Sequence, residues 1–180
     1  AILETRRKIE RECRLTVSLE TANRELQSLA STDVLTKVAS RSYFNEYLHR
    51  EWKRLQKHQL SLSLILCKID FLQIDYQGKD EYLCHIADTM KKCKRRSTDF
   101  IARYSDEQFI MILANTQIEE AKEVVKAIQN SIESLNVHNE FLKINFGVTS
   151  MIPSAESEPY QLVKNAENEL SESKEQLTII

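Results

Sequence analysis

The chain of 180 residues is 42% hydrophobic and 29% charged, which suits one folded domain with an appendage and excludes a disordered chain. Its net charge of −2 at pH 7 excludes a global field that would recruit nucleic acid, and no segment approaches the roughly 20 apolar residues of a membrane span. With only two glycines, the chain also lacks a glycine-rich phosphate-binding loop.

Residues 1–30 contain neither glycine nor proline and predict one long helix. Apolar residues along its second half alternate in steps of four and three, which is typical of a coiled-coil seam. The seam residues are Leu15, Leu19, Ala22, Leu26 and Leu29. Because the other faces are charged, we interpret the helix as a dimerising one; the alternative is a helix that packs on its own domain.

Beyond residue 30, the hydrophobic pattern predicts helices and strands in alternation. Amphipathic helices are expected at residues 41–56, 80–93, 118–135 and from Pro159 onward, and strands at residues 60–69 and 141–151. Such interleaving indicates an α/β fold in which helices pack on a sheet. We therefore divide the chain into a helix of residues 1–30 and a domain of residues 31–180.

A β-hairpin with a polar tip is predicted for residues 99–113. Two apolar runs flank the turn-forming residues Ser105 and Asp106. Acidic residues on such a tip are candidate ligands of a metal or a phosphate, and a solvated turn is the alternative.

The cysteines and histidines show no metal-binding spacing, such as CxxC or HExxH. Scattered cysteines in a chain of this size indicate reduced thiols, and therefore a cytoplasmic protein. Because the chain begins with Ala1, we expect it to be a fragment of a longer protein.

Five motifs, in order along residues 31–176, resemble the GGDEF domain of the diguanylate cyclase family. They are TDVLTKVASR from Thr32, LSLILCKID, DFIARY from Asp99, the pair Gly147-Val148, and Lys174 in the last helix. The resemblance implies a central five-stranded sheet flanked by helices, related to the ferredoxin-like fold and to the palm of polymerases and nucleotide cyclases. It also implies a reaction in which a homodimer joins two GTP molecules into cyclic di-GMP.

Set against the family pattern, the expected metal-binding residues are altered. Lys68 stands where the family has a metal-binding aspartate, while Asp70 and Glu107 keep acidic positions. Because a lysine repels a metal ion and supplies no oxygen ligand, we expect no metal cofactor.

The signature itself also departs from the family. Ser105 and Asp106 replace two glycines that allow a close approach of the nucleotide, and Gln108 replaces a glutamate. Asp80 aligns with a guanine contact, and Lys174 matches a lysine of the family's closing helix. We interpret the departures as a loss of catalysis and predict that the chain is not an enzyme.

The family's RxxD motif, where cyclic di-GMP binds, is intact as Arg96-Ser97-Thr98-Asp99. An arginine can hold guanine or phosphate with two hydrogen bonds, and an aspartate can accept from guanine N–H groups. The alternative is that Asp99 caps the following strand and that the basic residues are a solvated helix end.

The sequence therefore favours a signalling module that dimerises through its N-terminal helix and works with a protein partner or an upstream sensory domain. One alternative is a cyclic di-GMP receptor that uses Arg96 and Asp99. The other is a domain that retains GTP binding or diguanylate cyclase activity.

Overall fold

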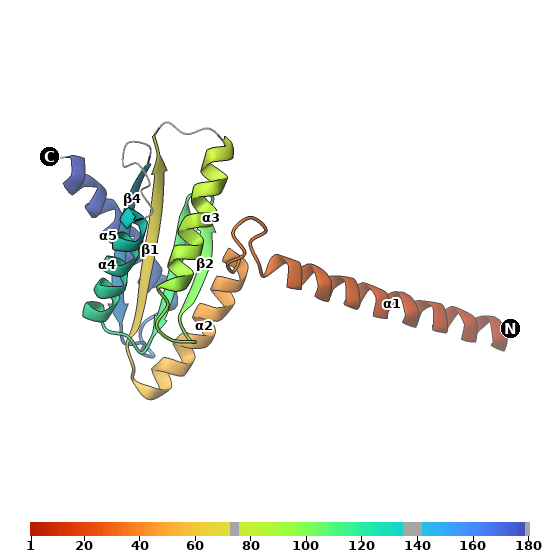
Figure 1. The fold of residues 1–180 in the computed structure, drawn as a ribbon. Helices are drawn as coiled ribbons and strands as arrows, with labels where there is room; N and C mark the ends of the chain where they lie inside the picture. Colours follow the sequence, from red (N-terminus) through yellow and green to blue (C-terminus); the bar gives the residue numbers. More distant parts are fainter. Residues whose placement is uncertain (73–75, 135–141, 179–180) are drawn as a thin grey trace.

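A computed structural model describes most of the chain (Figure 1). It covers residues 1–72, 76–134 and 142–178, and the side chains of these residues except 23–30, 76–77 and 174–178. In chain order the elements are α1 (Ile2–Ala30), α2 (Arg41–His58), β1 (Leu62–Phe71), α3 (Tyr76–Lys92), β2 (Phe100–Ser105), β3 (Gln108–Ala114), α4 (Ile118–Ser134), β4 (Leu142–Met151) and α5 (Pro159–Thr178). The predicted α/β fold, its elements and the N-terminal helix are confirmed.

Four antiparallel strands form the sheet among the described residues, in the order β2-β3-β1-β4. The resemblance implied five strands. Outside the strand β2, a single residue, Ala39, forms a parallel bridge with Ala102. The chain cannot continue this pairing because α2 begins two residues later, where the Ser40 hydroxyl accepts a hydrogen bond from the amide of Tyr43. The fifth strand that the resemblance implied is therefore reduced to a single bridging residue, Ala39.

Helices cover both faces of the sheet, so the central strand β1 is apolar almost throughout (Figure 1). Ile65, Cys67 and Ile69 belong to the core that α3 and α4 complete on one face. Leu64 and Leu66, one residue out of step, belong to the core that α2 and α5 complete on the other. Burial raises the pKa of the Cys67 thiol, which therefore stays protonated as a small apolar core residue.

The helix α5 lies unusually close to β4. A Cβ atom added at Gly147 would stand 2.3 Å from the carbonyl oxygen of Ala166 and 2.9 Å from the amide nitrogen of Leu170. Only glycine permits this approach, because the neighbouring atoms belong to the helix backbone. Gly147 thus fixes α5 over the β4 side of the sheet.

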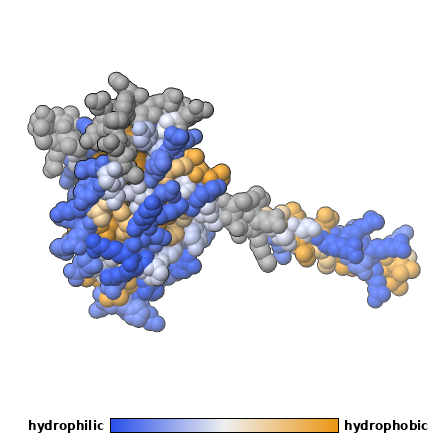
Figure 2. Space-filling model, in the orientation of Figure 1, coloured by the Kyte–Doolittle hydropathy of each residue, from blue (hydrophilic) through white to orange (hydrophobic). Residues whose placement is uncertain are grey.

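The helix α1 projects away from the domain (Figure 1), and each of its described side chains is exposed. Apolar side chains lie at its surface in Figure 2, and among them Leu15 and Leu19 are 64% and 65% exposed. The remaining leucines of the predicted seam, Leu26 and Leu29, lie outside the described side chains. Within the described parts of the chain, no helix is long and apolar enough to cross a membrane.

Candidate functional site

The tip of the β2–β3 hairpin lies beside the end of β1. Lys68 is the register partner of Gln108, and the amide of Ile69 donates a hydrogen bond to the carbonyl oxygen of Glu107 at 2.9 Å. The structure therefore brings together residues of the sequence-predicted site that are about 40 positions apart. We call Lys68, Asp70, Lys79 and Glu107 the hairpin site.

Positive and negative side chains alternate in the hairpin site. The Lys68 ammonium lies 3.9 Å from the carboxylate of Asp70, and the Lys79 ammonium lies 4.0 Å from that of Glu107. The buried Asn145 amide also donates to Asp70, at 3.2 Å. Lys79, which comes from α3, was not among the predicted site residues because no sequence pattern links it to the hairpin.

The hairpin site does not fit a divalent metal ion. Magnesium and similar ions need several oxygen ligands, whereas Asp70 and Glu107 each lie beside a lysine ammonium. Across the described residues, no three acidic, histidine or cysteine side chains are grouped so that they could hold a metal.

The other predicted residues of the signature lie at the surface. The Ser105 hydroxyl donates to the Gln108 side-chain oxygen at 2.9 Å, so these two side chains satisfy each other across the turn. Asp106 is exposed at the tip, and Asp80 is exposed on α3. Lys174 lies outside the described side chains.

A contact that the sequence did not reveal ties the hairpin to the segment after α1. The Arg103 guanidinium donates through Nη1 to both carboxylate oxygens of Asp33, at 3.3 and 3.2 Å, and through Nη2 to the carbonyl oxygen of Asp106, at 2.9 Å. The side chains of Arg103 and Asp33 are only 17% and 20% exposed. Arg103 therefore bridges the exit of α1 and the hairpin tip. The paired residues are 70 positions apart, so no local pattern could have indicated the bridge.

The charge of Asp33 is stabilised in the folded state. Burial by itself raises the pKa of Asp33, but hydrogen bonds from the Thr36 side chain and backbone, together with the Arg103 guanidinium, outweigh it and hold the pKa below its ordinary value of 3.8. Asp33 is thus ionised at neutral pH and available as a fixed anion for Arg103.

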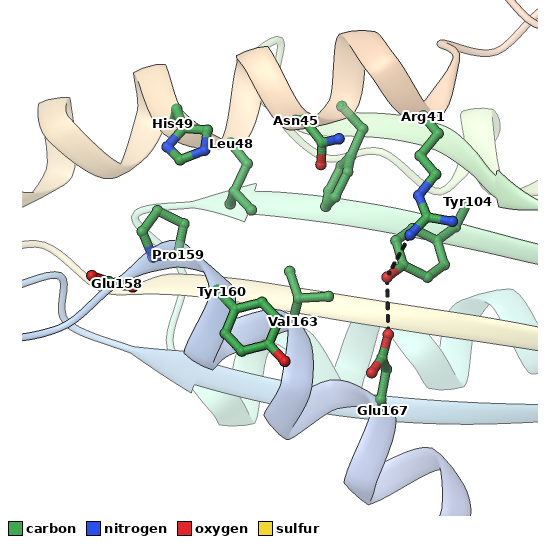
Figure 3. A pocket seen from close by; sticks show the side chains of 11 residues that line it. Arg41, Asn45, Leu48, His49, Tyr104, Glu158, Pro159, Tyr160, Val163 and Glu167 are labelled. Atoms are coloured by element: carbon green, nitrogen blue, oxygen red, sulfur yellow. Dashed lines mark hydrogen bonds between the residues drawn. The ribbon is translucent and has the colours of Figure 1, made fainter.

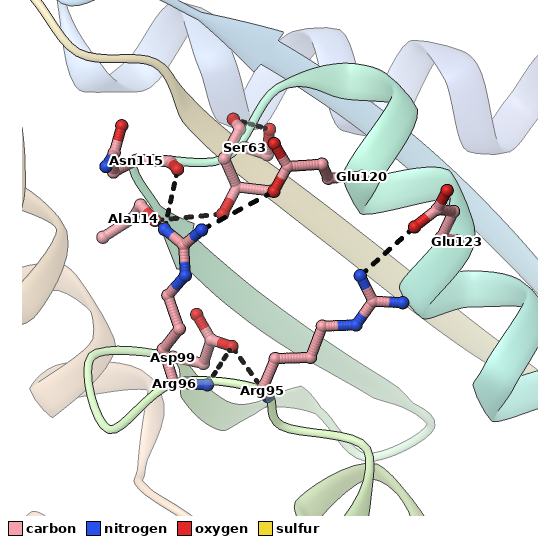
Figure 4. A network of polar contacts seen from close by, with 9 residues as sticks. Ser63, Arg95, Arg96, Asp99, Ala114, Asn115, Glu120 and Glu123 are labelled. Carbon is pink, nitrogen blue, oxygen red and sulfur yellow. Dashed lines mark hydrogen bonds and ion pairs between the residues drawn. The ribbon is translucent and has the colours of Figure 1, made fainter.

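Figure 4 shows the residues of the RxxD motif in a network of contacts. Asp99 is buried, and one of its carboxylate oxygens accepts hydrogen bonds from the amides of Arg95 and Arg96, both at 3.0 Å. The Arg96 guanidinium donates to the carbonyl oxygen of Asn115 at 2.9 Å and lies 3.7 Å from the carboxylate of Glu120. The carboxylate of Asp99 thus contacts the turn before it rather than the strand β2 that follows, whereas Arg96 keeps a half-exposed side chain.

Comparisons with known proteins identify the family: the chain belongs to the GGDEF family, described as diguanylate cyclase, GGDEF domain, which matches residues 30–178. A relative from Treponema denticola named Diguanylate cyclase A is 30% identical over 166 residues, which are 85% of this chain and 44% of that protein. Curated relatives from Pseudomonas aeruginosa and Escherichia coli match over 17% and 37% of their lengths. The chain thus spans less than half the length of these relatives.

Solved structures of GGDEF domains share the fold. The diguanylate cyclase SiaD of Pseudomonas aeruginosa, solved in complex with its activator SiaC, is 25% identical with a TM-score of 0.73; the match covers 96% of this chain and 70% of that one. The coiled coil and GGDEF domain of DgcB from Caulobacter crescentus, solved with c-di-GMP, is 20% identical with a TM-score of 0.70 and coverages of 92% and 93%.

Family membership corrects one expectation from the sequence. The prediction that the chain is not an enzyme is wrong, because the chain belongs to a family of cyclases and is 30% identical to a named diguanylate cyclase. The prediction judged each altered position separately and counted Lys68 and Asp106 as losses. In the folded protein, Lys79 lies beside Glu107 as Lys68 lies beside Asp70, so the charges of the site are arranged in pairs that the sequence did not show.

We expect Asp33→Asn to lower the free energy of unfolding by about 1–2 kcal/mol at pH 7, because the variant loses the charge that faces Arg103. The folded-state pKa of Asp33 lies below 3.8, so the contribution is complete above that value and disappears as the pH falls through the lower folded-state pKa. Urea denaturation at pH 7 and at pH 3 measures both effects.

The matched control for this prediction is Asp88→Asn. The Asp88 side chain is 63% exposed and, among the described residues, pairs only with Lys91 at 3.7 Å on the same helix, so its loss should cost less than about 0.5 kcal/mol. An equal loss of stability in the two variants would contradict the role given to Asp33.

Proposed function

We propose that the chain is a signalling domain of cyclic di-GMP metabolism that pairs with a second copy through α1 and transmits the state of that pairing to the β2–β3 hairpin. The observation that carries the proposal is the Arg103 bridge between Asp33, which follows α1, and Asp106, at the hairpin tip. In this proposal residues 1–30 form the pairing helix, residues 31–180 form the responding domain, and the protein works in the cytoplasm, where GTP is available.

Pairing of two copies is supported by the surface of α1. Leu15 and Leu19 lie one helical turn apart, and both expose more than half of their surface to solvent. Leucines at this spacing on a helix that projects from its domain gain stability when a second helix covers them. The related DgcB structure contains a coiled coil next to its GGDEF domain, which agrees with this proposal.

Transmission from α1 to the hairpin follows from how short the connection is. Only Ser31 and Thr32 separate the end of α1 from Asp33, and the carbonyl oxygen of Ser31 accepts a hydrogen bond from the amide of Ser40 at 2.9 Å. A rotation or shift of α1 therefore moves Asp33, because the connecting segment is too short to absorb the movement. Because the Arg103 guanidinium has a second contact on Asp106, movement of Asp33 changes the position of the hairpin tip.

A protein partner or an upstream sensory domain would supply the signal. The related cyclase SiaD has been solved with its activator SiaC, which shows that a partner protein can act on a GGDEF protein. We propose that a comparable input acts on this chain through α1.

Pairing through α1 predicts that Leu15→Asp combined with Leu19→Asp shifts the chain from dimer to monomer, because a buried charge without a partner opposes association. Sedimentation equilibrium at micromolar concentrations measures the mass. We expect the dimer dissociation constant to rise at least ~100-fold, which is a change of about 2.7 kcal/mol.

Val17→Asp is the matched control, because Val17 is equally exposed, at 61%, but lies on the opposite side of the helix from Leu15 and Leu19. It should leave the mass unchanged. A dimer that survives the double substitution, or one that Val17→Asp disrupts equally, would contradict pairing along this seam.

A second candidate function is the diguanylate cyclase reaction itself. It is favoured by the relative named Diguanylate cyclase A, which is 30% identical over most of this chain. Incubation of the dimer with GTP and Mg²⁺ or Mn²⁺, followed by chromatography of the nucleotides, tests it. Formation of cyclic di-GMP supports this candidate, and unchanged GTP excludes it.

A third candidate is a cyclic di-GMP receptor, favoured by the half-exposed guanidinium of Arg96. Asp99 Oδ2 accepts from the amides of Arg95 and Arg96, while Oδ1 is buried and has no hydrogen-bond partner among the described residues. Asp99 could therefore accept from the ligand only if Oδ1 became accessible, which makes Arg96 the principal contact in this candidate. The DgcB structure in complex with c-di-GMP shows that a protein of this fold binds the ligand.

If the chain is such a receptor, calorimetry should detect micromolar binding of cyclic di-GMP that Arg96→Ala weakens at least ~10-fold, since a charge-assisted contact is lost. Arg54→Ala, which removes an arginine paired with Glu51 on α2, is the control and should bind like the unaltered chain. Absence of heat with the unaltered chain would exclude this candidate.

A further inference from the structure

A groove of about 550 Å³ lies between α2 and α5, on the sheet face opposite α3 and α4 (Figure 3). Its volume is within the range of pockets that hold ligands or side chains of partners. The groove lies on the other face of the sheet from α3, which contributes Lys79 to the hairpin site, and Tyr104 of β2 lines the groove. Neither the family resemblance nor the proposed signalling role accounts for it.

The positions of the two helices explain why the groove exists. Gly147 lets α5 approach β4 closely, which fixes this helix near one edge of the sheet. At the other edge, Tyr47 of α2 stacks on Phe100 of β2 with ring centroids 4.2 Å apart, and the Tyr47 hydroxyl donates to the carbonyl oxygen of Thr98 at 2.8 Å. Because these contacts hold the two helices toward opposite edges, a surface groove remains between them above the side chains of Phe44, Leu48 and Val163.

The floor of the groove is apolar. Phe44 and Leu48 of α2 and Val163 of α5 line it, and the first two are almost fully buried. The methylene groups of a long side chain would contact these surfaces while its polar end stays near the rim.

The rim of the groove is acidic and aromatic on the α5 side. Glu158, Tyr160 and Glu167 line it, and Tyr160 is 66% exposed. In Figure 3 the Tyr160 ring lies between the two glutamates. Within the described part of the chain, neither Glu158 nor Glu167 forms an ion pair, so this side of the groove carries negative charge that the protein does not neutralise by direct pairing.

The opposite rim shows that the chemistry of the groove suits a guanidinium. The Arg41 guanidinium of α2 lies 4.3 Å from the centre of the Tyr104 ring, a cation–π contact. The Tyr104 hydroxyl donates to Glu167 at 2.9 Å, and burial followed by this hydrogen bond raises the pKa of Tyr104, so the phenol remains a donor at neutral pH. The chain's own arginine thus uses one of the two tyrosine rings that line the groove, and the exposed ring of Tyr160 is left for a second cation.

We propose that the groove between α2 and α5 binds a segment of a partner protein that inserts an arginine or lysine side chain. The aliphatic part of that side chain lies on Leu48 and Val163, and its cation lies over Tyr160 between Glu158 and Glu167. Charge complementarity selects this occupant. Glu158 and Glu167 would repel an acidic segment, and a purely apolar segment would remove water from both carboxylates without supplying a cation.

The test is an NMR titration of the isotope-labelled chain with the peptide acetyl-Leu-Arg-Leu-amide, with acetyl-Leu-Gln-Leu-amide as the neutral control peptide. We expect saturable shifts confined to the amides of residues 41–49 and 158–167, at least ~10-fold weaker with the glutamine peptide and weakened by salt. Absence of saturable shifts in these segments, or equal binding of both peptides, would overturn the proposal.

Glu158→Gln combined with Glu167→Gln should abolish the preference for arginine while leaving the melting temperature near that of the unaltered chain, because glutamine can still accept from Tyr104. Tyr160→Ala should weaken binding through loss of the exposed ring. The control, Glu169→Gln with Glu172→Gln, removes two exposed acids of α5 outside the groove and should have no effect. Equal effects of the two double variants would overturn the proposal. Chemical shifts of the groove residues that depend on protein concentration would also overturn it, because they would indicate that a second copy of the chain occupies the groove.

Discussion

The double contact of Arg103 is the constraint on which the proposed signalling role depends. Its guanidinium holds Asp33, which follows α1, and the backbone of Asp106, at the tip of the hairpin. Arg103 Nε is buried without a hydrogen-bond partner among the described residues, so the two Nη groups fix the position of the side chain. A lysine would not reproduce both contacts, because its three donors share one nitrogen, whereas the guanidinium carries the two contacts on separate atoms, Nη1 and Nη2. Arg103 therefore links the hairpin tip to the exit of α1.

The sheet carries two separate surfaces, and a different feature of the backbone determines where each one lies. Pairing of β1 with β3 brings Lys68 and Asp70 to the hairpin tip, where Lys79 and Glu107 complete an alternation of charges. On the opposite face, α5 lies close to β4 at Gly147, and a groove with an acidic rim lies between α5 and α2. The first surface carries residues at the positions of the family signature, whereas the second is the groove that we propose for a protein partner.

Much of the fold could be predicted from the sequence because its strongest signals are periodic. The apolar run of β1 and the amphipathic helices gave each element to within a few residues, and the polar tip at Ser105 and Asp106 located the hairpin. The contacts that give the site its character were missed, because they join residues distant in sequence. Lys79 beside Glu107 and Asp33 beside Arg103 depend on how elements pack, and the contacts of Asp99 with the amides of Arg95 and Arg96 depend on the conformation of the loop before β2. The incorrect prediction that the chain is not an enzyme also came from the altered signature alone.

The most direct measurement of the central claim is hydrogen exchange of the chain before and after Arg103→Lys. If Arg103 joins the exit of α1 to the hairpin, amides of residues 31–40 and 103–108 should both lose protection, by ~10-fold or more, which is about 1.4 kcal/mol. Protection of β4, which does not contact Arg103, should stay unchanged and serves as the internal control. Faster exchange in one of the two segments alone would contradict the account, because the segments would then move independently.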